Sequence, residues 1–343
     1  MTTDILAGKT ILVTGGTGSI GMEIVRQALD HGAGKVIVFS RDEIKHFMIR
    51  KEISDDRLQT VVGDIRDSRT VEQVFARFDI DILYHAAAMK HVVMCEDFPL
   101  ESVQTNILGT QNVVDLALKH LVSKVITIST DKAAYPANVM GASKFIAEKI
   151  TLNANRMSRG KQAFSCVRFG NVANSRGSVI PVFVDNLLNH NLLQVTDPKV
   201  TRFIMEIPDA VRLVIAATEY AQGGEIFILK MNAFKLEDLV DVMIERIAPR
   251  LNVSKNDIRV NTSGLVAGEK LHENLINDTE SSRLYELKDM YVLLPDTESS
   301  IKYPAITKAS LSRYASSDVE LISKDEIEQI AVKYVERRSR SHG

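Results

Sequence analysis

Residues 10–29 contain the pattern that most restricts the fold of this chain: a short apolar strand, a glycine-rich loop and a helix. The strand covers residues 10–13, the glycines of the loop stand three apart, and helical character follows over residues 23–29. Glycines permit a tight turn and the close approach of a diphosphate, which the free N–H groups of a helix N-terminus bind. A glycine loop alone is a weak signal, but this context predicts a dinucleotide site. Its expected residues are Gly15, Thr17, Gly18, Ser19, Ile20 and Gly21.

The end of the second expected strand bears on which dinucleotide binds. Residues 35–39 form that strand, and Ser40, Arg41 and Asp42 follow it. They lie about twenty residues past the glycine loop, where a residue meets the adenosine ribose. An acidic residue at the first position favours NAD, whereas an arginine binds the 2′-phosphate of NADP. Ser40 and Arg41 therefore favour NADP, with Lys45 assisting, while the Asp42 carboxylate keeps NAD as the less favoured alternative.

The third and fourth expected strands, residues 58–62 and 81–84, also lead into candidate cofactor contacts. Asp64 follows the third strand, where its carboxylate would accept from the adenine amine, and turn formation is the alternative. Neither His85 nor His91 has a visible acid–base partner, so both are weak catalytic candidates. Small residues after the fourth strand let the backbone pass close to a cofactor. The further cofactor candidates are Asp64, Ile65, Ala86, Ala87, Ala88 and Asn106.

The alternation of strands and helices predicts an α/β fold with a doubly wound parallel sheet, the Rossmann arrangement. Two more strands are expected at residues 125–128 and 164–168, after which the alternation loosens. We therefore expect a smaller, interleaved C-terminal substrate lobe. The expected division is an NADP-binding Rossmann domain at 1–170, to which segments of about 205–230 return, and a lobe with a C-terminal extension at 171–343. Basic residues in the second half are candidates to hold a second diphosphate: Arg168, Arg176, Lys199 and Arg202.

The composition excludes several classes of protein. A net charge of −2 gives no general attraction for nucleic acid or anionic membranes. No run approaches the roughly 18 apolar residues of a membrane span, and the start lacks the pattern of a signal peptide. We expect a cytoplasmic protein without nucleic acid or membrane partners. Cys95 and Cys166 lack the spacing of a metal site, so we expect reduced thiols and no bound metal.

The stretch from Ser129 to Lys144 is the expected centre of the chemistry. The β-branched run at 125–128 reads as a buried parallel strand, and small polar and charged residues follow where it ends. Ligands of open α/β sheets bind outside the carboxyl ends of the strands, so these side chains would face a ligand. A helical pattern begins near Val139 and places Met140 and Lys144 one turn apart on one face. The catalytic candidates are Thr130, Asp131, Lys132, Met140 and Lys144.

The motifs together resemble the extended short-chain dehydrogenases/reductases. They read T-G-x-x-G-x-x-G from Thr14, G-D-I-R-D from Gly63, H-A-A-A-x-K-H-V from His85, N-x-x-G-T from Asn106 and S-T-D-K-A from Ser129. Longer runs are similar to the bacterial UDP-N-acetylglucosamine 4,6-dehydratases of capsule and flagellin-sugar synthesis. These runs are S-T-D-K-A-x-x-P-x-N-x-M-G-x-S-K, R-x-G-N-V-x-x-S-R-G-S-V-I-P and T-D-P-x-x-T-R-F. The likeness extends from about residue 8 to 275.

Two departures from the wider superfamily stand out. Its usual Y-x-x-x-K is here Met140-x-x-x-Lys144, so the phenol that normally shuttles the substrate proton is absent. Some members of this dehydratase group similarly carry methionine, which shifts proton transfer to Asp131 and Lys132. Tyr135 comes five residues too early to replace the phenol unless its loop folds back. The second departure is the run 264–267, where the relatives often have an arginine.

The resemblance implies a lyase that converts UDP-N-acetylglucosamine to a UDP-4-keto-6-deoxy-hexosamine for surface polysaccharide or glycan synthesis. The chemistry is internal redox through NADP, with Lys132 as the base for carbon 5 and Asp131 as the acid for the departing hydroxyl. Thr130 would bind O4, and Lys144 would hold the nicotinamide ribose. A homo-oligomer is expected, built on dimers, with hexamers known among these dehydratases. The residues implied to line the UDP-sugar site are Lys90, Asn171, Val179, Arg202 and Glu269.

Two other functions remain open from the sequence. A UDP-N-acetylhexosamine 4-epimerase would use the same fold and the same first hydride transfer, but such an enzyme normally needs the missing tyrosine. A non-catalytic NADP-binding protein would explain Met140 as the mark of a lost active site. The retained Asp131–Lys132 pair argues against that second alternative.

Overall fold

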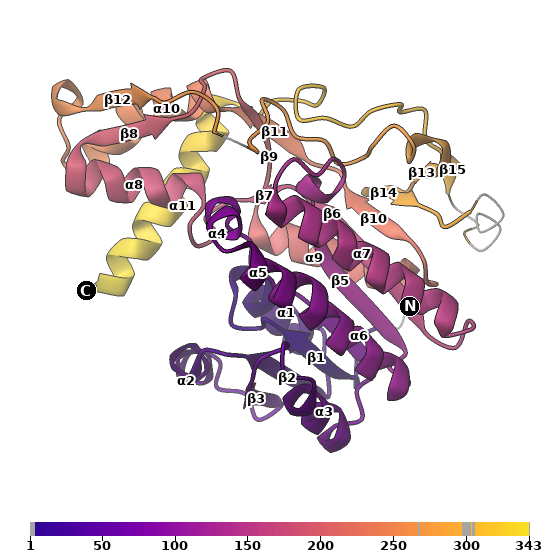
Figure 1. The fold of residues 1–343 in the computed structure, drawn as a ribbon. Helices are drawn as coiled ribbons and strands as arrows, with labels where there is room; N and C mark the ends of the chain where they lie inside the picture. The colour runs from indigo at the N-terminus through magenta and orange to yellow at the C-terminus, as the bar shows by residue number, and fades with distance from the viewer. Residues whose placement is uncertain (1–3, 267, 297–302, 304–305, 343) are drawn as a thin grey trace.

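The computed structural model describes residues 4–266, 268–296, 303 and 306–342. These residues form a large α/β part and a smaller group of elements at the upper left in Figure 1. Ala267, the last residue of the run where relatives often carry an arginine, lies outside the described residues. No helix in the described ranges is both long and apolar enough to cross a membrane.

The main sheet is parallel from β3 to β10 and ends in three antiparallel strands. Its first six strands follow the order 3-2-1-4-5-6, which confirms the predicted doubly wound Rossmann fold. The order reverses between β1 and β4, so a crevice for a ligand is expected there. Across the sheet the strands are β15 (Thr307–Lys308), β13 (Leu284–Glu286), β14 (Met290–Leu293), β10 (Ile226–Leu229), β6 (Ala163–Phe169), β5 (Lys124–Thr130), β4 (Ile82–His85), β1 (Thr10–Thr14), β2 (Lys35–Ser40) and β3 (Leu58–Val62).

Alternate residues of the parallel strands bury opposite faces of this sheet. Ile11 and Val13 of β1 join an apolar cluster with helices α1 and α9, while Leu12 between them joins a second cluster with α3 and α6. A strand covered on both faces must be apolar at nearly every position, which is why these strands are uninterrupted hydrophobic runs. The helices of this part are α1 (Ser19–Asp30), α2 (Glu43–Glu52), α3 (Ser68–Arg77), α4 (Val92–Asp97), α5 (Pro99–Ser102), α6 (Gly109–Lys119), α7 (Val139–Met157) and α9 (Ile207–Tyr220).

Residues 99–119 are helical throughout but not uniformly α-helical. The π-helical turn η1 (Val103–Leu108) separates α5 from α6. Asn106 lies in this wider turn, and its side-chain amide bonds to the backbone of Met89. Such turns are often found at functional sites, and here the turn directs a polar side chain at the loop that follows β4.

The smaller lobe begins where β7 (Asn171–Val172) follows β6, at the carboxyl edge of the main sheet. It has its own apolar core, built from α8, α10, α11 and the small sheets beside them. The chain returns to the larger part at residues 207–229, which contain α9 and the main-sheet strand β10. Strands β13 to β15 join the same sheet from later in the chain. The further elements are β8 (Leu192–Val195), β9 (Thr201–Met205), β11 (Asn232–Lys235), β12 (Arg259–Thr262), α8 (Val179–His190), α10 (Leu236–Val242), α11 (Lys324–His342), η2 (Asp131–Ala133), η3 (Met243–Ile247), η4 (Ala248–Leu251), η5 (Lys255–Asp257) and η6 (Ser281–Arg283).

Candidate active site

The glycine loop joins β1 to α1 with no room for side chains at two of its glycines. Gly15 has φ +68°, and a Cβ there would lie 2.7 Å from the backbone nitrogen of Ala87. A Cβ on Gly21 would lie 2.3 Å from the Gly15 carbonyl oxygen. Gly18 is the N-cap of α1 and makes no side-chain cap, so the first N–H groups of the helix stay available to an anion. The loop therefore has the shape and the donors that a dinucleotide diphosphate needs.

The residues after β2 divide into a buried hydroxyl and an exposed cation. The Ser40 hydroxyl bonds to Thr17 Oγ1 and to His46 Nε2, each at 2.9 Å. The Arg41 side chain is 55% exposed and lies 3.7 Å from Asp64. It is thus accessible to a phosphate outside the end of β2.

The Asp42 carboxylate is engaged within its own helix. It caps α2 by accepting from the Lys45 backbone N–H at 3.1 Å, and it pairs with the Lys45 ammonium at 2.6 Å. The bond from the Lys45 side chain is the main reason why the pKa of Asp42 is lowered. The carboxylate that would accept from a ribose 2′-hydroxyl is therefore already paired with Lys45.

The loop after β4 lies against the glycine loop and is braced from behind by Asn106. The Asn106 side chain accepts from the Met89 N–H at 2.8 Å and donates to the Met89 carbonyl at 3.0 Å. Asn106 is 1% exposed, so its side chain supports this loop and has almost no surface open to a ligand. Ile65 is likewise buried, in the core beneath the expected adenine site.

His85 is a structural residue of the core. Its two ring nitrogens bond to Thr14 Oγ1 and Thr110 Oγ1 at 2.7 and 2.9 Å. Complete burial lowers the pKa of His85 to about 3. The ring is therefore neutral over the physiological range and does not serve as an acid.

The predicted catalytic pair meets directly at the carboxyl end of β5. Asp131 is fully buried, and its Oδ1 accepts from Thr130 Oγ1 at 2.6 Å and from Lys132 Nζ at 3.1 Å. The Lys132 side chain is 18% exposed. A carboxylate and an ammonium in direct contact can exchange one proton, so this cluster can supply both an acid and a base.

Sequence reasoning missed a third member of this cluster, Glu273. Its Oε1 lies 3.3 Å from Lys132 Nζ, and its side chain is 4% exposed. Burial acts to lower the pKa of Lys132, but the charges of Asp131 and Glu273 outweigh it and the pKa is raised. The only sequence signal was the nearby run from Gly268 to Lys270, and nothing in that run singles out residue 273.

The helix α7 carries Met140 in the place of the usual tyrosine and keeps the usual lysine as Lys144. Met140 is 4% exposed and Lys144 is 6% exposed. Within the described ranges, Lys144 Nζ makes no hydrogen bond or ion pair, and burial lowers the pKa of Lys144. The hydroxyl of Tyr135 accepts from the Asp278 N–H at 2.7 Å, so it points toward the C-terminal half instead of replacing the phenol.

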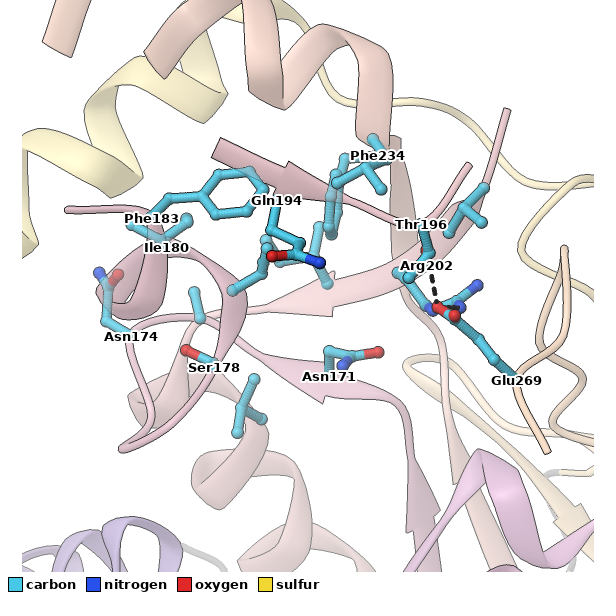
Figure 2. A pocket seen from close by; sticks show the side chains of 16 residues that line it. Asn171, Asn174, Ser178, Ile180, Phe183, Gln194, Thr196, Arg202, Phe234 and Glu269 are labelled. Atoms are coloured by element: carbon cyan, nitrogen blue, oxygen red, sulfur yellow. Dashed lines mark hydrogen bonds and ion pairs between the residues drawn. The ribbon is translucent and has the colours of Figure 1, made fainter. Parts of the chain in front are cut away.

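A pocket in the smaller lobe contains four of the five predicted substrate residues (Figure 2). Arg202 and Glu269 form an ion pair of 2.7 Å at one end of it, and Thr196 donates to the same carboxylate. The four residues are Asn171, Val179, Arg202 and Glu269. Lys90 is the exception, because its ammonium donates to the Arg176 carbonyl at 2.8 Å outside this pocket.

Arg168 corrects one expectation from the sequence. It was a candidate for binding a second diphosphate, but it is fully buried between Glu148 and Glu280, with contacts of 2.7 and 2.8 Å. A side chain without exposed surface and with two carboxylate partners does not bind a ligand. Arg176 instead lies over the glycine loop, where its guanidinium donates to the Thr17 carbonyl.

The sequence profile of a family described as polysaccharide biosynthesis protein matches residues 11–295. This chain belongs to that family. The comparisons also confirm the resemblance to extended short-chain dehydrogenases/reductases and to the UDP-N-acetylglucosamine 4,6-dehydratases among them.

Three relatives show how names vary within the family. An uncharacterized membrane protein of Methanocaldococcus jannaschii is 43% identical, over 94% of this chain and 95% of its own. A UDP-glucose 4-epimerase of Rickettsia conorii is 35% identical, with the same two shares. The inverting UDP-N-acetylglucosamine 4,6-dehydratase of Campylobacter jejuni is 38% identical, over 84% of this chain and 83% of its own. The family is thus one of nucleotide-sugar dehydratases and epimerases.

Two solved structures share the fold over nearly the whole chain. The X-ray structure of Pen from Bacillus thuringiensis is 38% identical, with a TM-score of 0.88 over 96% of this chain and 98% of its own. The structure of DesIV, a dTDP-glucose 4,6-dehydratase from Streptomyces venezuelae with NAD and TYD bound, has a TM-score of 0.72 over the same two shares. DesIV is 21% identical, so that likeness shows the fold alone.

Proposed function

We propose that the protein is an NADP-dependent UDP-N-acetylglucosamine 4,6-dehydratase that forms a UDP-4-keto-6-deoxy-hexosamine for surface polysaccharide or glycan synthesis. The observation that carries the proposal is the contact of Lys132 with Asp131 at the carboxyl end of β5, beside Met140. An enzyme that removes water needs a base and an acid at one sugar, and this pair supplies both where the usual phenol is missing.

The glycine loop and the N-terminus of α1 fit the diphosphate of a dinucleotide. When bound, the cofactor would take a hydride from carbon 4 of the sugar and return it to carbon 6. The chain's own contributions are the first N–H groups of α1 for the diphosphate and Arg41 for a 2′-phosphate. Lys144 would hold the nicotinamide ribose, and its cation favours the ionised forms of nearby acids.

The acid and base roles require one proton to move within the pair. Lys132 and Asp131 form an ion pair in which Nζ and Oδ1 are 3.1 Å apart. Transfer of a proton from Nζ to Oδ1 gives an amine that can take the proton from carbon 5 and an acid that can protonate the departing hydroxyl. Thr130 Oγ1 would bind O4.

The pocket of Figure 2 is proposed as the UDP-sugar site. Asn171 and Val179 line it from β7 and the first residue of α8. The Arg202 guanidinium would bind the diphosphate while it keeps its contact with Glu269. Lys90 would reach the sugar nucleotide only if its ammonium leaves the Arg176 carbonyl. We also propose a homo-oligomer built on dimers.

Proton NMR of UDP-N-acetylglucosamine in heavy water, with the purified protein and catalytic NADP⁺, tests this function. We expect a new 6-deoxy methyl signal and deuterium at carbon 5, because a base on the protein exchanges its proton with solvent. The reaction should need no added reductant, since the hydride returns to the same sugar. The coupling constants will also report the configuration at carbon 5.

A 4-epimerase is the second candidate because several Rickettsia relatives are named UDP-glucose 4-epimerase. In the NMR experiment it would give the galacto isomer with no methyl signal, which would refute dehydration. Methionine at position 140 argues against this candidate, because a thioether does no acid–base work. Absence of any product with both NADP⁺ and NAD⁺ would instead favour a non-catalytic protein.

The preference for NADP is tested by Arg41→Ala. The substitution should weaken NADP⁺ binding by roughly 10- to 100-fold, as expected for loss of one charged hydrogen bond, and leave NAD⁺ binding unchanged. Isothermal titration with both dinucleotides measures the ratio. Arg77→Ala at the far end of α3 is the matched control. Equal losses for the two dinucleotides would show that Arg41 does not contact the 2′-phosphate.

A further inference from the structure

Lys132 lies between two buried carboxylates, not one. Asp131 Oδ1 and Glu273 Oε1 are 3.1 and 3.3 Å from its Nζ. The second oxygen of Glu273 is buried and has no hydrogen-bond partner in the part of the chain that the structure describes. A buried carboxylate is costly unless it is paired, and the Lys132 ammonium is the cation that pairs with Glu273.

The position of Glu273 is fixed by its backbone. Its N–H donates to the hydroxyl of Ser316 at 3.0 Å, and its carbonyl accepts from the Ser316 N–H at 2.9 Å. Ser316 is fully buried and bonds in turn to Thr201 Oγ1 at 2.7 Å. Glu273 therefore cannot drift away from Lys132 without breaking these contacts.

We propose that Glu273 is a positioning residue that holds the Lys132 side chain from a second side and so keeps Nζ in place to act on the sugar. This inference rests on the proposed function. An ammonium has three N–H groups, and two of them are taken by Asp131 and Glu273. When the proton moves from Nζ to Asp131, rotation about the Cε–Nζ bond turns the lone pair of the amine toward the sugar, one N–H stays on Glu273, and Glu273 gains no proton. Glu273 thus holds the base in place through the transfer.

Four charged groups surround the ammonium and set its titration. Asp131 and Glu273 are the acidic ones, and Arg202 and Lys270 are the basic ones. Arg202 is paired with Glu269, and the Lys270 ammonium donates to the Tyr135 carbonyl. Replacement of Glu273 by glutamine keeps an acceptor for the N–H but removes a negative charge. The neutral amine should then form at lower pH.

The test is the pH dependence of acetylation at Lys132, measured by peptide mass spectrometry after brief treatment of the full-length protein with acetic anhydride. Glu273→Gln should lower the pKa of Lys132 by about one unit or more, since an opposite charge this close shifts a pKa by roughly 1–3 units. The acidic limb of the pH–rate profile should move by the same amount. Glu273→Asp, which keeps the charge, should retain most of the wild-type value.

The matched control is Glu286→Gln, which removes a carboxylate from the Lys230 ammonium far along the sheet and should leave Lys132 unchanged. An unshifted acetylation profile in Glu273→Gln overturns the proposal. If that variant does not fold, a wild-type pKa of Lys132 at or below about 10.4, the ordinary lysine value, overturns it as well. Acetylation needs no turnover, so failure of the dehydratase function, seen as no methyl signal from the wild type, is a separate result.

Discussion

Lys132→Ala should abolish the conversion of UDP-N-acetylglucosamine while leaving dinucleotide binding intact. The substitution removes the proposed base for carbon 5 and leaves the Asp131 and Glu273 carboxylates without the cation that they share. Loss of a general base costs roughly 10²- to 10⁴-fold, and here the acid loses its proton source as well. The rate of methyl signal formation by NMR measures activity, and isothermal titration with NADP⁺ measures cofactor binding.

Lys230→Ala is the control for this experiment. Lys230 also contacts a carboxylate, Glu286, at 2.7 Å, but the pair lies between β10 and β13 and away from Asp131. That variant should keep wild-type activity. If Lys132→Ala retained more than a tenth of the wild-type rate, the assignment of Lys132 as the base would be wrong.

Arg168→Met should destabilise the protein by about 3–5 kcal/mol, the cost of removing one partner from a buried ion pair. Arg168 has no exposed surface and contacts both Glu148 and Glu280. The methionine fills much of the same volume but leaves two buried carboxylates without their cation. Urea unfolding followed by circular dichroism measures the change in the free energy of unfolding.

Two further variants separate charge from packing. Arg313→Met removes an arginine that pairs with Asp318 on the surface, and it should cost only about 0–1 kcal/mol. Glu148→Gln and Glu280→Gln combined with Arg168→Met should recover part of the lost stability, because positions 148 and 280 then carry no charge that needs a cation. A loss below about 1 kcal/mol for Arg168→Met alone would mean that the buried arginine is not needed to neutralise the two acids.

Much of the fold follows from local patterns in the sequence. The run from Val125 to Ile128 is β-branched at every position and lies within β5, a strand whose two faces are covered. The carboxyl ends of parallel strands meet at one edge of the sheet. The polar residues at the end of this strand therefore lie at the same edge as the loops after β1 and β4. The contact between Asp131 and Lys132 was predictable for the same reason: both residues lie in the same turn after the strand.

The missed features all depend on contacts between distant parts of the chain. Glu273 reaches Lys132 only because Ser316 and Thr201 fix the segment that carries it. Arg168 looked like a ligand-binding cation because its partners, Glu148 and Glu280, stand on α7 and in the C-terminal half. Asn106 was expected to contact the cofactor, and the π-helical turn that directs its side chain at Met89 leaves no mark in the amphipathic pattern.

The bond between Glu273 and Ser316 makes the C-terminal segment part of the surroundings of Lys132, the proposed catalytic base. The family profile ends at residue 295, yet Ser316 lies beyond it and fixes the residue that faces Lys132. Relatives could therefore tune the strength of the same base through changes in their tails, without altering any motif of the Rossmann domain. The basicity of this lysine would then depend on the C-terminal segment as much as on the loop after β5.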